Sequence, residues 1–188
     1  MSHRRGHSIM RDTLRKAAAA AVATAALAAG TVVTGASTAT AATGETTATC
    51  QTSGLRAELT ATDPDQIGMS HRGKLLRLTN TSDRTCALRG YPGLELEDAG
   101  HRPLGADTRW GSTYFVQDPG KQTLFLQPGR SAEADLVWAV ADGTRDLRAS
   151  YLEITPPASA DHLTIPFEER VTNGVLSVTA LAYRISVP

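Results

Sequence analysis

From residue 55 onward, apolar and polar residues alternate along the chain in short runs. A period of two places every second side chain on one face, which is typical of half-buried β-strands. No run shows the 3.6-residue period of an amphipathic helix. The apolar positions that alternate are Leu55, Ala57, Leu59 and Ala61; Leu76 and Leu78; Leu94 and Leu96; Leu124 and Leu126; Ala134, Leu136 and Trp138; Leu152 and Ile154; and Leu176, Val178 and Ala180. Seven or eight short strands of this kind predict an all-β, antiparallel sandwich.

Turn signals separate these runs. Pro92-Gly93, Pro119-Gly120 and Pro128-Gly129 each suit a type II turn, in which the glycine takes a positive φ. Asp98-Ala99-Gly100 predicts a tight hairpin with its glycine in the left-handed conformation. Pro156-Pro157 is expected to end the preceding strand, because proline cannot donate to a sheet.

The first 41 residues are typical of a secretory signal peptide. A basic segment, Met1–Lys16, precedes an apolar one, Ala17–Ala29, and Ala39-Thr40-Ala41 fits the cleavage pattern. The alternative is an uncleaved membrane anchor, but the apolar run is shorter than the roughly 20 residues of a membrane-spanning helix. The sequence therefore predicts a secreted protein with three segments and no transmembrane segment in the mature chain: a signal peptide (1–41), a flexible tether (42–49) and one β-sandwich domain (50–188).

The charge of the predicted mature chain argues against some partners. The full chain of 188 residues is formally neutral, but five of its 19 Lys and Arg and one of its 19 Asp and Glu precede residue 42. The remainder carries a formal charge of −4. A mildly acidic domain does not attract nucleic acid or an anionic membrane surface. We therefore expect no nucleic-acid partner.

Cys50 and Cys86 are the only cysteines. In an oxidising compartment outside the cell, the simple expectation is a disulfide between them. The alternative is a pair of free or metal-binding thiols, although neither CxxC spacing nor a nearby histidine cluster supports it.

The sequence offers no catalytic or cofactor motif. His71, His101 and His162 do not have metal-ligand spacing, and no nucleophile or phosphate-loop motif accompanies them. We therefore predict a non-enzymatic protein without catalytic residues, cofactor or bound metal. Asn80-Thr-Ser82 fits a glycosylation acceptor, but we interpret it structurally, with Asn, Ser and Asp side chains bonding to local backbone at a strand end.

Aromatic residues give the remaining indication of function. Trp138 alternates with Leu136 and is expected in the core. Trp110, Tyr114 and Phe115 lie in a long predicted connection, 106–122. Aromatic side chains on a loop supported by a rigid sandwich form a plausible binding surface. The alternative is that they cover an open end of the core.

Several segments together resemble a known family. The central one is Leu78-Thr-Asn-Thr-Ser-Asp-Arg-Thr-Cys-Ala-Leu-Arg-Gly-Tyr-Pro-Gly-Leu-Glu-Leu96, and the others are Gly100–Leu104, Leu126–Ala132, Leu136–Trp138 and Leu152–Pro157. Residues 50–182 thereby resemble the DUF4232 family of secreted actinobacterial proteins. The resemblance implies an exported or surface-attached β-sandwich of immunoglobulin-like kind, and it implies no activity.

Many members of that family look as if they carry a second cysteine pair. The corresponding stretches here, 142–148 and 167–172, have no cysteine. We hypothesise that opposite charges partly replace it, for example Arg145 or Arg148 with Glu168 or Glu169. An exposed pair of this kind contributes only about 0–1 kcal/mol.

The sequence as a whole predicts a secreted, non-enzymatic β-sandwich that binds a protein or a cell-envelope component. Two alternatives stay open, both with a site in the loops at one end of the sandwich. One is an uncharacterised enzyme, which would need several convergent polar groups with perturbed pKa values. The other is a copper or zinc carrier, which would need unpaired cysteines beside His and Met ligands.

Overall fold

The computed structural model describes residues 46–140 and 145–188. The predicted signal peptide and the first residues of the predicted tether, 42–45, lie outside the described residues. No helix among the described residues is long and apolar enough to cross a membrane. The elements are a 3₁₀ turn, η1 (Thr52–Gly54), and strands β1 (Leu55–Thr60), β2 (Ile67–Gly68), β3 (His71–Asn80), β4 (Cys86–Arg89), β5 (Gly93–Glu97), β6 (Asp107–Trp110), β7 (Thr123–Leu126), β8 (Ser131–Ala139), β9 (Asp146–Thr155), β10 (Leu163–Thr172) and β11 (Val175–Val178).

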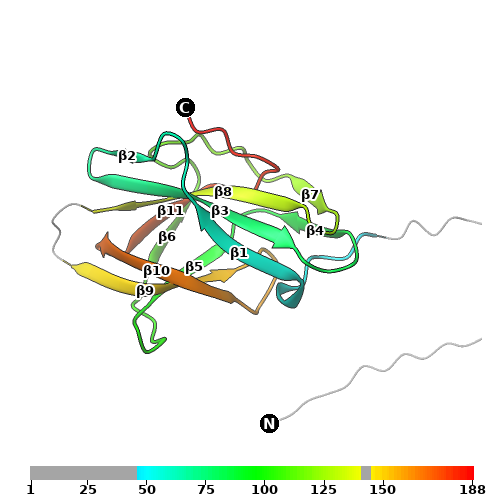
Figure 1. Ribbon diagram of the computed structural model, residues 1–188, viewed down its shortest axis with the longest axis horizontal. Coiled ribbons are helices and arrows are strands. Elements are labelled where there is room, and N and C mark those ends of the chain that lie inside the picture. Colours follow the sequence, from blue (N-terminus) through cyan, green and yellow to red (C-terminus); the bar gives the residue numbers. More distant parts are fainter. Residues whose placement is uncertain (1–45, 141–144) are drawn as a thin grey trace, which may run out of the picture. The chain divides into compact units, whose positions relative to one another are not determined.

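The strands form three sheets (Figure 1). The largest has the order β1-β3-β8-β11-β6, with the short β2 paired to β3. A second has the order β10-β9-β5, and β4 pairs with β7 in a third. The all-β class and its antiparallel sheets are confirmed, with one exception: β6 runs parallel to β11.

The predicted number of strands was wrong, since the described residues contain eleven. β2 has only two residues and β6 has one apolar residue among its four, so neither alternates in the sequence, whereas β4 alternates over its four residues and was not predicted. β10 is long, but a register shift between Pro166 and Glu169 interrupts it. Its alternate residues from Leu163 to Val171 are nevertheless buried or half-buried, a period of two that was not among the predicted runs.

The alternation correctly predicted the core. One continuous cluster contains all or most of the apolar residues of each predicted run. Trp138 is buried, as expected, and its ring meets Phe167 edge-on at 4.9 Å. The central strand β8 departs from simple alternation, because Asp135 and Val137 on its other face are buried too.

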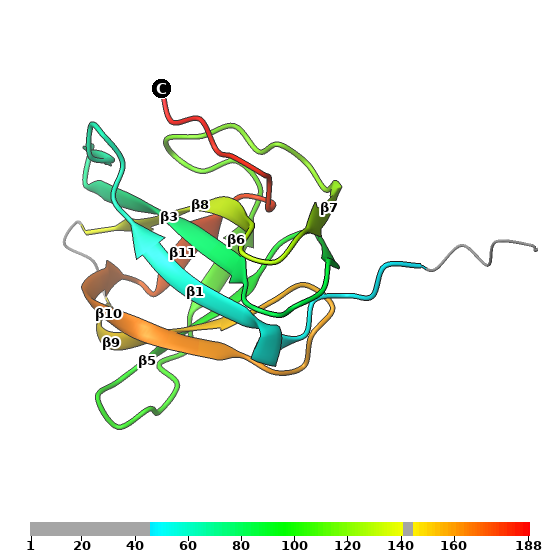
Figure 2. The same cartoon turned by 45° about the vertical axis from the view of Figure 1, so that its right-hand side comes forward.

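A second, smaller apolar cluster explains why β8 is buried on both faces. Val116, Ala182 and Ile185 form it, and Phe115 packs against it. The segment 111–122 and the C-terminal segment after β11 lie together over this side of the largest sheet (Figure 2). The connection that carries the predicted binding residues therefore covers part of a core.

The turns agree only in part with the predictions. Gly120 and Gly129 have a φ of 75°, as type II turns require. Gly93 does not take a positive φ, because it is already the first residue of β5. In the 98–102 turn the left-handed residue is His101 (φ 56°) and not Gly100. The strand before Pro156 ends at Thr155, one residue after the predicted end at Ile154.

An ion pair does join residues 142–148 to residues 167–172, the stretches that correspond to the family's second cysteine pair. The pairs that were suggested from the sequence, between Arg145 or Arg148 and Glu168 or Glu169, were wrong. Arg170 on β10 pairs with Asp146 on β9 at 3.4 Å. Glu169 instead pairs with Lys74, and Arg145 donates to the carbonyls of residues 104 and 105. The Arg170–Asp146 pair is partly exposed, so its contribution is about 0–1 kcal/mol.

Candidate functional site

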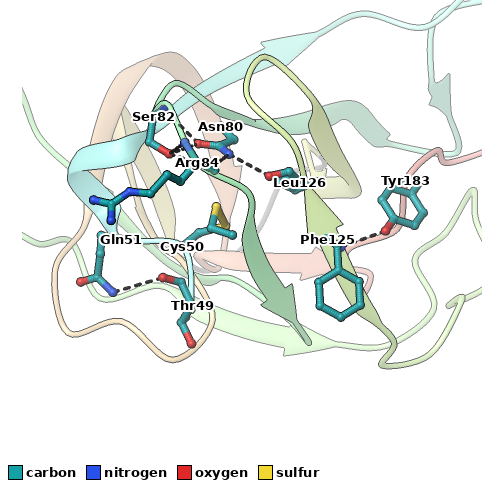
Figure 3. The surroundings of a disulfide bond; sticks show 10 residues. Thr49, Cys50, Gln51, Asn80, Ser82, Arg84, Phe125, Leu126 and Tyr183 are labelled. Atoms are coloured by element: carbon teal, nitrogen blue, oxygen red, sulfur yellow. Dashed lines mark hydrogen bonds between the residues drawn. A yellow bond between two sulfur atoms is a disulfide. The ribbon is translucent and has the colours of Figure 1, made fainter. Parts of the chain in front are cut away.

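Cys50 and Cys86 form a disulfide, with 4.8 Å between their Cα atoms (Figure 3). The bond joins the segment before η1 to the first residue of β4. Backbone hydrogen bonds support the same junction, from the Cys50 amide to the Ala87 carbonyl and from the Ala87 amide to the Ala48 carbonyl. The predicted disulfide is confirmed, and Ala48 and Cys50 are both joined to β4 by backbone hydrogen bonds.

Asn80 organises the chain beside this disulfide (Figure 3). Its side chain is fully buried, and its amide nitrogen donates to the carbonyls of Arg84 and Leu126 at 2.7 and 2.8 Å. Its oxygen accepts from the Ser82 amide and hydroxyl. The structural interpretation of Asn80 and Ser82 is confirmed, whereas Asp83 is exposed and lies near the Arg84 side chain instead.

Trp110 is not in a loop but is the last residue of β6. Its ring lies 6.3 Å from Tyr91, its indole nitrogen donates to the Pro92 carbonyl, and 63% of the residue is exposed. The hydroxyl of Tyr91 donates to Asp118, and that hydrogen bond raises the pKa of Tyr91. Trp110 is therefore held by its contacts with the Tyr91 ring and the Pro92 carbonyl.

Tyr114 and Phe115 form a different group. Their rings meet edge-on at 5.0 Å, and Tyr114 stacks on the His71 ring at 4.5 Å. Phe115 is half-buried against the smaller apolar cluster, whereas Tyr114 is 52% exposed. Both interpretations of the aromatic residues therefore have a counterpart: Phe115 covers a core, and Tyr114 presents a face to solvent.

The β2–β3 hairpin extends this exposed apolar area. Gly68 pairs with His71, so Met69 and Ser70 alone make the turn. Met69 is 79% exposed, the largest exposure among the big apolar side chains described, and Ile67 is 64% exposed. The hairpin abuts the aromatic pair, since a Cβ on Gly68 would lie 3.8 Å from the Phe115 ring. We call Ile67, Met69, His71, Tyr114 and Phe115 the hairpin-tip surface.

The turn itself has an unusual backbone. Met69 and Ser70 both have positive φ, 46° and 60°. Two such residues in a two-residue hairpin give a type I′ turn, for which Asn-Gly is strongly preferred. Methionine and serine bear a Cβ that disfavours this conformation. Strain of this kind, when it is observed, points to a function for the segment that carries it.

A buried carboxylate fastens both halves of the hairpin-tip surface to the sheet. Asp135 on β8 accepts hydrogen bonds from Gln66 Nε2 at 2.7 Å and from the Thr113 hydroxyl at 2.5 Å. Gln66 immediately precedes β2, and Thr113 immediately precedes Tyr114. Burial raises the pKa of Asp135, and the two hydrogen bonds oppose that rise.

Gly73 on β3 leaves room for this arrangement. A Cβ at Gly73 would lie 1.9 Å from Gln66 Oε1, so any larger residue would displace the Gln66 side chain. Gln66, Gly73 and the role of Asp135 were not predicted from the sequence. The signal that was available is a lone acid, Asp135, inside the apolar run 134–140 of a central strand.

Other features offer less chemistry. Within residues 46–140 and 145–188, no group of three or more His, Cys, Asp or Glu side chains could hold a metal ion. His101 pairs with Glu97 and stacks on Tyr151, and His162 pairs with Glu153. A depression of about 860 Å³ lies beside the disulfide and is lined mainly by small polar residues from 46–54 and 81–86.

Comparison with known proteins assigns the family. Neither a curated protein nor a solved structure matches the chain. Among protein families, residues 50–182 match the one described as "Domain of unknown function (DUF4232)". The match covers most of the chain and contains the disulfide, the hairpin-tip surface and Asp135. The chain therefore belongs to the DUF4232 family.

Proposed function

We propose that the protein is an exported, non-enzymatic binding module that attaches through the hairpin-tip surface to a partner protein or cell-envelope component. The proposal includes removal of residues 1–41 as a signal peptide and an immunoglobulin-like sandwich as the scaffold. One observation carries it: a strained two-residue turn keeps Met69 exposed beside Tyr114. A turn that only joined two strands would gain stability from asparagine and glycine.

The side chains suit contact with a protein more than other kinds of partner. Aromatic residues and methionine are enriched in the centres of protein interfaces, and methionine adapts to irregular partner surfaces. Tyr114 loses little conformational freedom on binding, because the His71 ring already orients it. Phe115 and Asp135 hold the surface from beneath, so it is preorganised.

The two alternative functions have less support. An enzyme needs several titratable groups that converge on a cavity. Asp135 has a raised pKa, but it is fully buried and its carboxylate already accepts from Gln66 and Thr113. A copper or zinc carrier of the kind considered above needs free thiolates, and Cys50 and Cys86 are joined.

Retention of the purified, fluorescently labelled protein on isolated envelopes of the producing cells tests the proposal. Tyr114→Ser and Met69→Gln should each reduce retention several-fold. Phe125→Ser is the matched control, because Phe125 is 51% exposed on β7, whose partner is β4. Pretreating the envelopes with protease should abolish retention if the partner is a protein and spare it if the partner is another envelope component. Equal retention of all three variants would refute the hairpin-tip surface as the contact.

A further inference from the structure

A small cavity lies between β3, β8 and β10, near the β2 end of the largest sheet. Its volume is about 220 Å³, below the roughly 300 Å³ at which cavities for drug-sized ligands begin. Trp138, Arg72, Lys74, Glu169, Asp65 and Ala61 are among the residues that line it. A cavity of this size suits a ligand of only a few non-hydrogen atoms.

One of the lining residues has an unsatisfied donor. Trp138 is 1% exposed, and its indole N–H has no hydrogen-bond partner among the described residues. Buried indole N–H groups almost always find an acceptor, because leaving one unpaired is costly. The cavity therefore presents a buried donor without a partner, and Gln66 Oε1, on another lining residue, is a buried acceptor without one, so a ligand with both an acceptor and a donor would satisfy them.

The neighbouring charges specify the kind of acceptor. Arg72 is the register partner of Trp138, and Lys74 lies two residues further along β3, so all three project from the same face of the sheet. Two cations and an N–H donor on one face favour a carboxylate over a neutral acceptor.

Two acids among the lining residues balance these cations. Glu169 on β10 lies 3.9 Å from the Lys74 ammonium, and Asp65 precedes β2. A simple anion would face both acids without compensation, whereas a molecule that also carries an ammonium group would pair with them. The balance of two cations and two anions favours a zwitterion.

We propose that this cavity binds a small zwitterion, such as a free α-amino acid, with its carboxylate toward Trp138, Arg72 and Lys74 and its ammonium toward Glu169 and Asp65. The loose Lys74–Glu169 pair, 3.9 Å apart, separates when the ligand enters. The site borders the hairpin-tip surface: Ile67 belongs to both, and Gln66 and Gly73, which line the cavity, also support that surface. Failure of either proposal leaves the other standing.

NMR of the indole N–H tests the proposal directly. The chain has two tryptophans, so Trp110→Phe leaves Trp138 as the source of the only indole signal. Glycine and alanine are the probes, with acetate and methylammonium as molecules that carry one charge each. We expect glycine or alanine at millimolar concentration to shift the Trp138 signal saturably, and the two singly charged molecules to bind at least tenfold more weakly.

Three variants in the Trp110→Phe background locate the effect. Ala61→Phe should fill the mouth of the cavity and abolish the shift, because Ala61 lines the cavity and is exposed. Ala99→Phe, at an exposed turn residue outside the cavity, is its matched control and should bind normally. Arg72→Gln should weaken binding at least tenfold while leaving the thermal unfolding temperature unchanged.

The proposal is overturned by any of four results. No saturable shift with either amino acid would mean that the cavity has no zwitterion ligand. Acetate binding as tightly as glycine would mean a simple anion site. A shift that survives in Ala61→Phe would mean that the amino acid binds elsewhere. A water signal that stays at the Trp138 N–H in the presence of glycine would likewise contradict the proposal.

Discussion

Replacing the turn residues with their favoured counterparts, Met69→Asn together with Ser70→Gly, should stabilise the fold and weaken binding. Each residue with a Cβ in the left-handed conformation costs roughly 1–2 kcal/mol. Ser70→Gly removes this cost, and Met69→Asn removes part of it, because asparagine keeps a Cβ but tolerates the conformation, so about 2–3 kcal/mol is available for relief. The added glycine gives the unfolded chain more conformational freedom, which lowers the free energy of unfolding by about 0.4–1 kcal/mol. Loss of the Met69 side chain costs about 0.5 kcal/mol, since that residue is 79% exposed. The net expectation is a gain of about 1–2 kcal/mol.

Urea unfolding followed by tryptophan fluorescence measures this gain. The midpoint should rise at an unchanged m-value, and the unfolding temperature should rise by about 3–8 °C. Ala99→Gly is the matched control, because Ala99 has no positive φ and glycine there should stabilise nothing. The same double variant should lose retention on cell envelopes. A double variant that is no more stable than the wild type would refute strain at the turn, and one that is more stable but binds normally would refute its role in function.

Three further changes test other parts of the structure. Reducing the disulfide, or replacing Cys50 and Cys86 by serine, should lower the free energy of unfolding measured in urea by about 3–4 kcal/mol, because the bond closes a loop with a sequence separation of 36 residues. A loss below about 1 kcal/mol would show that the disulfide does not constrain the unfolded chain in this way. Asn80→Ala should cost about 2–4 kcal/mol, because it removes both donors from buried carbonyls; a cost near zero in the same assay would contradict its buried role. Asp135 has a folded-state pKa above its ordinary value of 3.8, so its contribution to stability is greatest below that pH and is lost as pH rises through the folded-state pKa. Asp135→Asn should therefore flatten the pH dependence of the unfolding free energy in that window, and an unchanged pH profile would show that Asp135 titrates normally.

Simple rules predicted the core well. Leu76, Leu78, Leu124 and Leu126 alternate with exposed or half-exposed residues and are all fully buried, because one sheet face meets the core and the other meets solvent. The rule failed at β8, which is covered on both faces. Whether a strand is central or at an edge depends on pairings between distant residues, and alternation within one run does not reveal it.

The candidate site was only partly predictable. Tyr114 stands out as an aromatic residue in a loop, but its position depends on His71 and on the hairpin, which come from a distant part of the chain. The hairpin could not be predicted from the sequence, because its turn lacks the asparagine and glycine by which type I′ turns are recognised. Trp110 was placed in the same loop, although pairing with β11 makes it part of a strand.

The disulfide also determines how the domain would respond to a pulling force applied at residue 46. β1 lies at the edge of the largest sheet and pairs only with β3, so a pull transmitted to it would open its hydrogen bonds one after another. The Cys50–Cys86 bond intercepts that load five residues before β1 begins and passes it to β4. In the oxidised protein the edge strand is therefore mechanically shielded, whereas reduction would make it the first element to peel away.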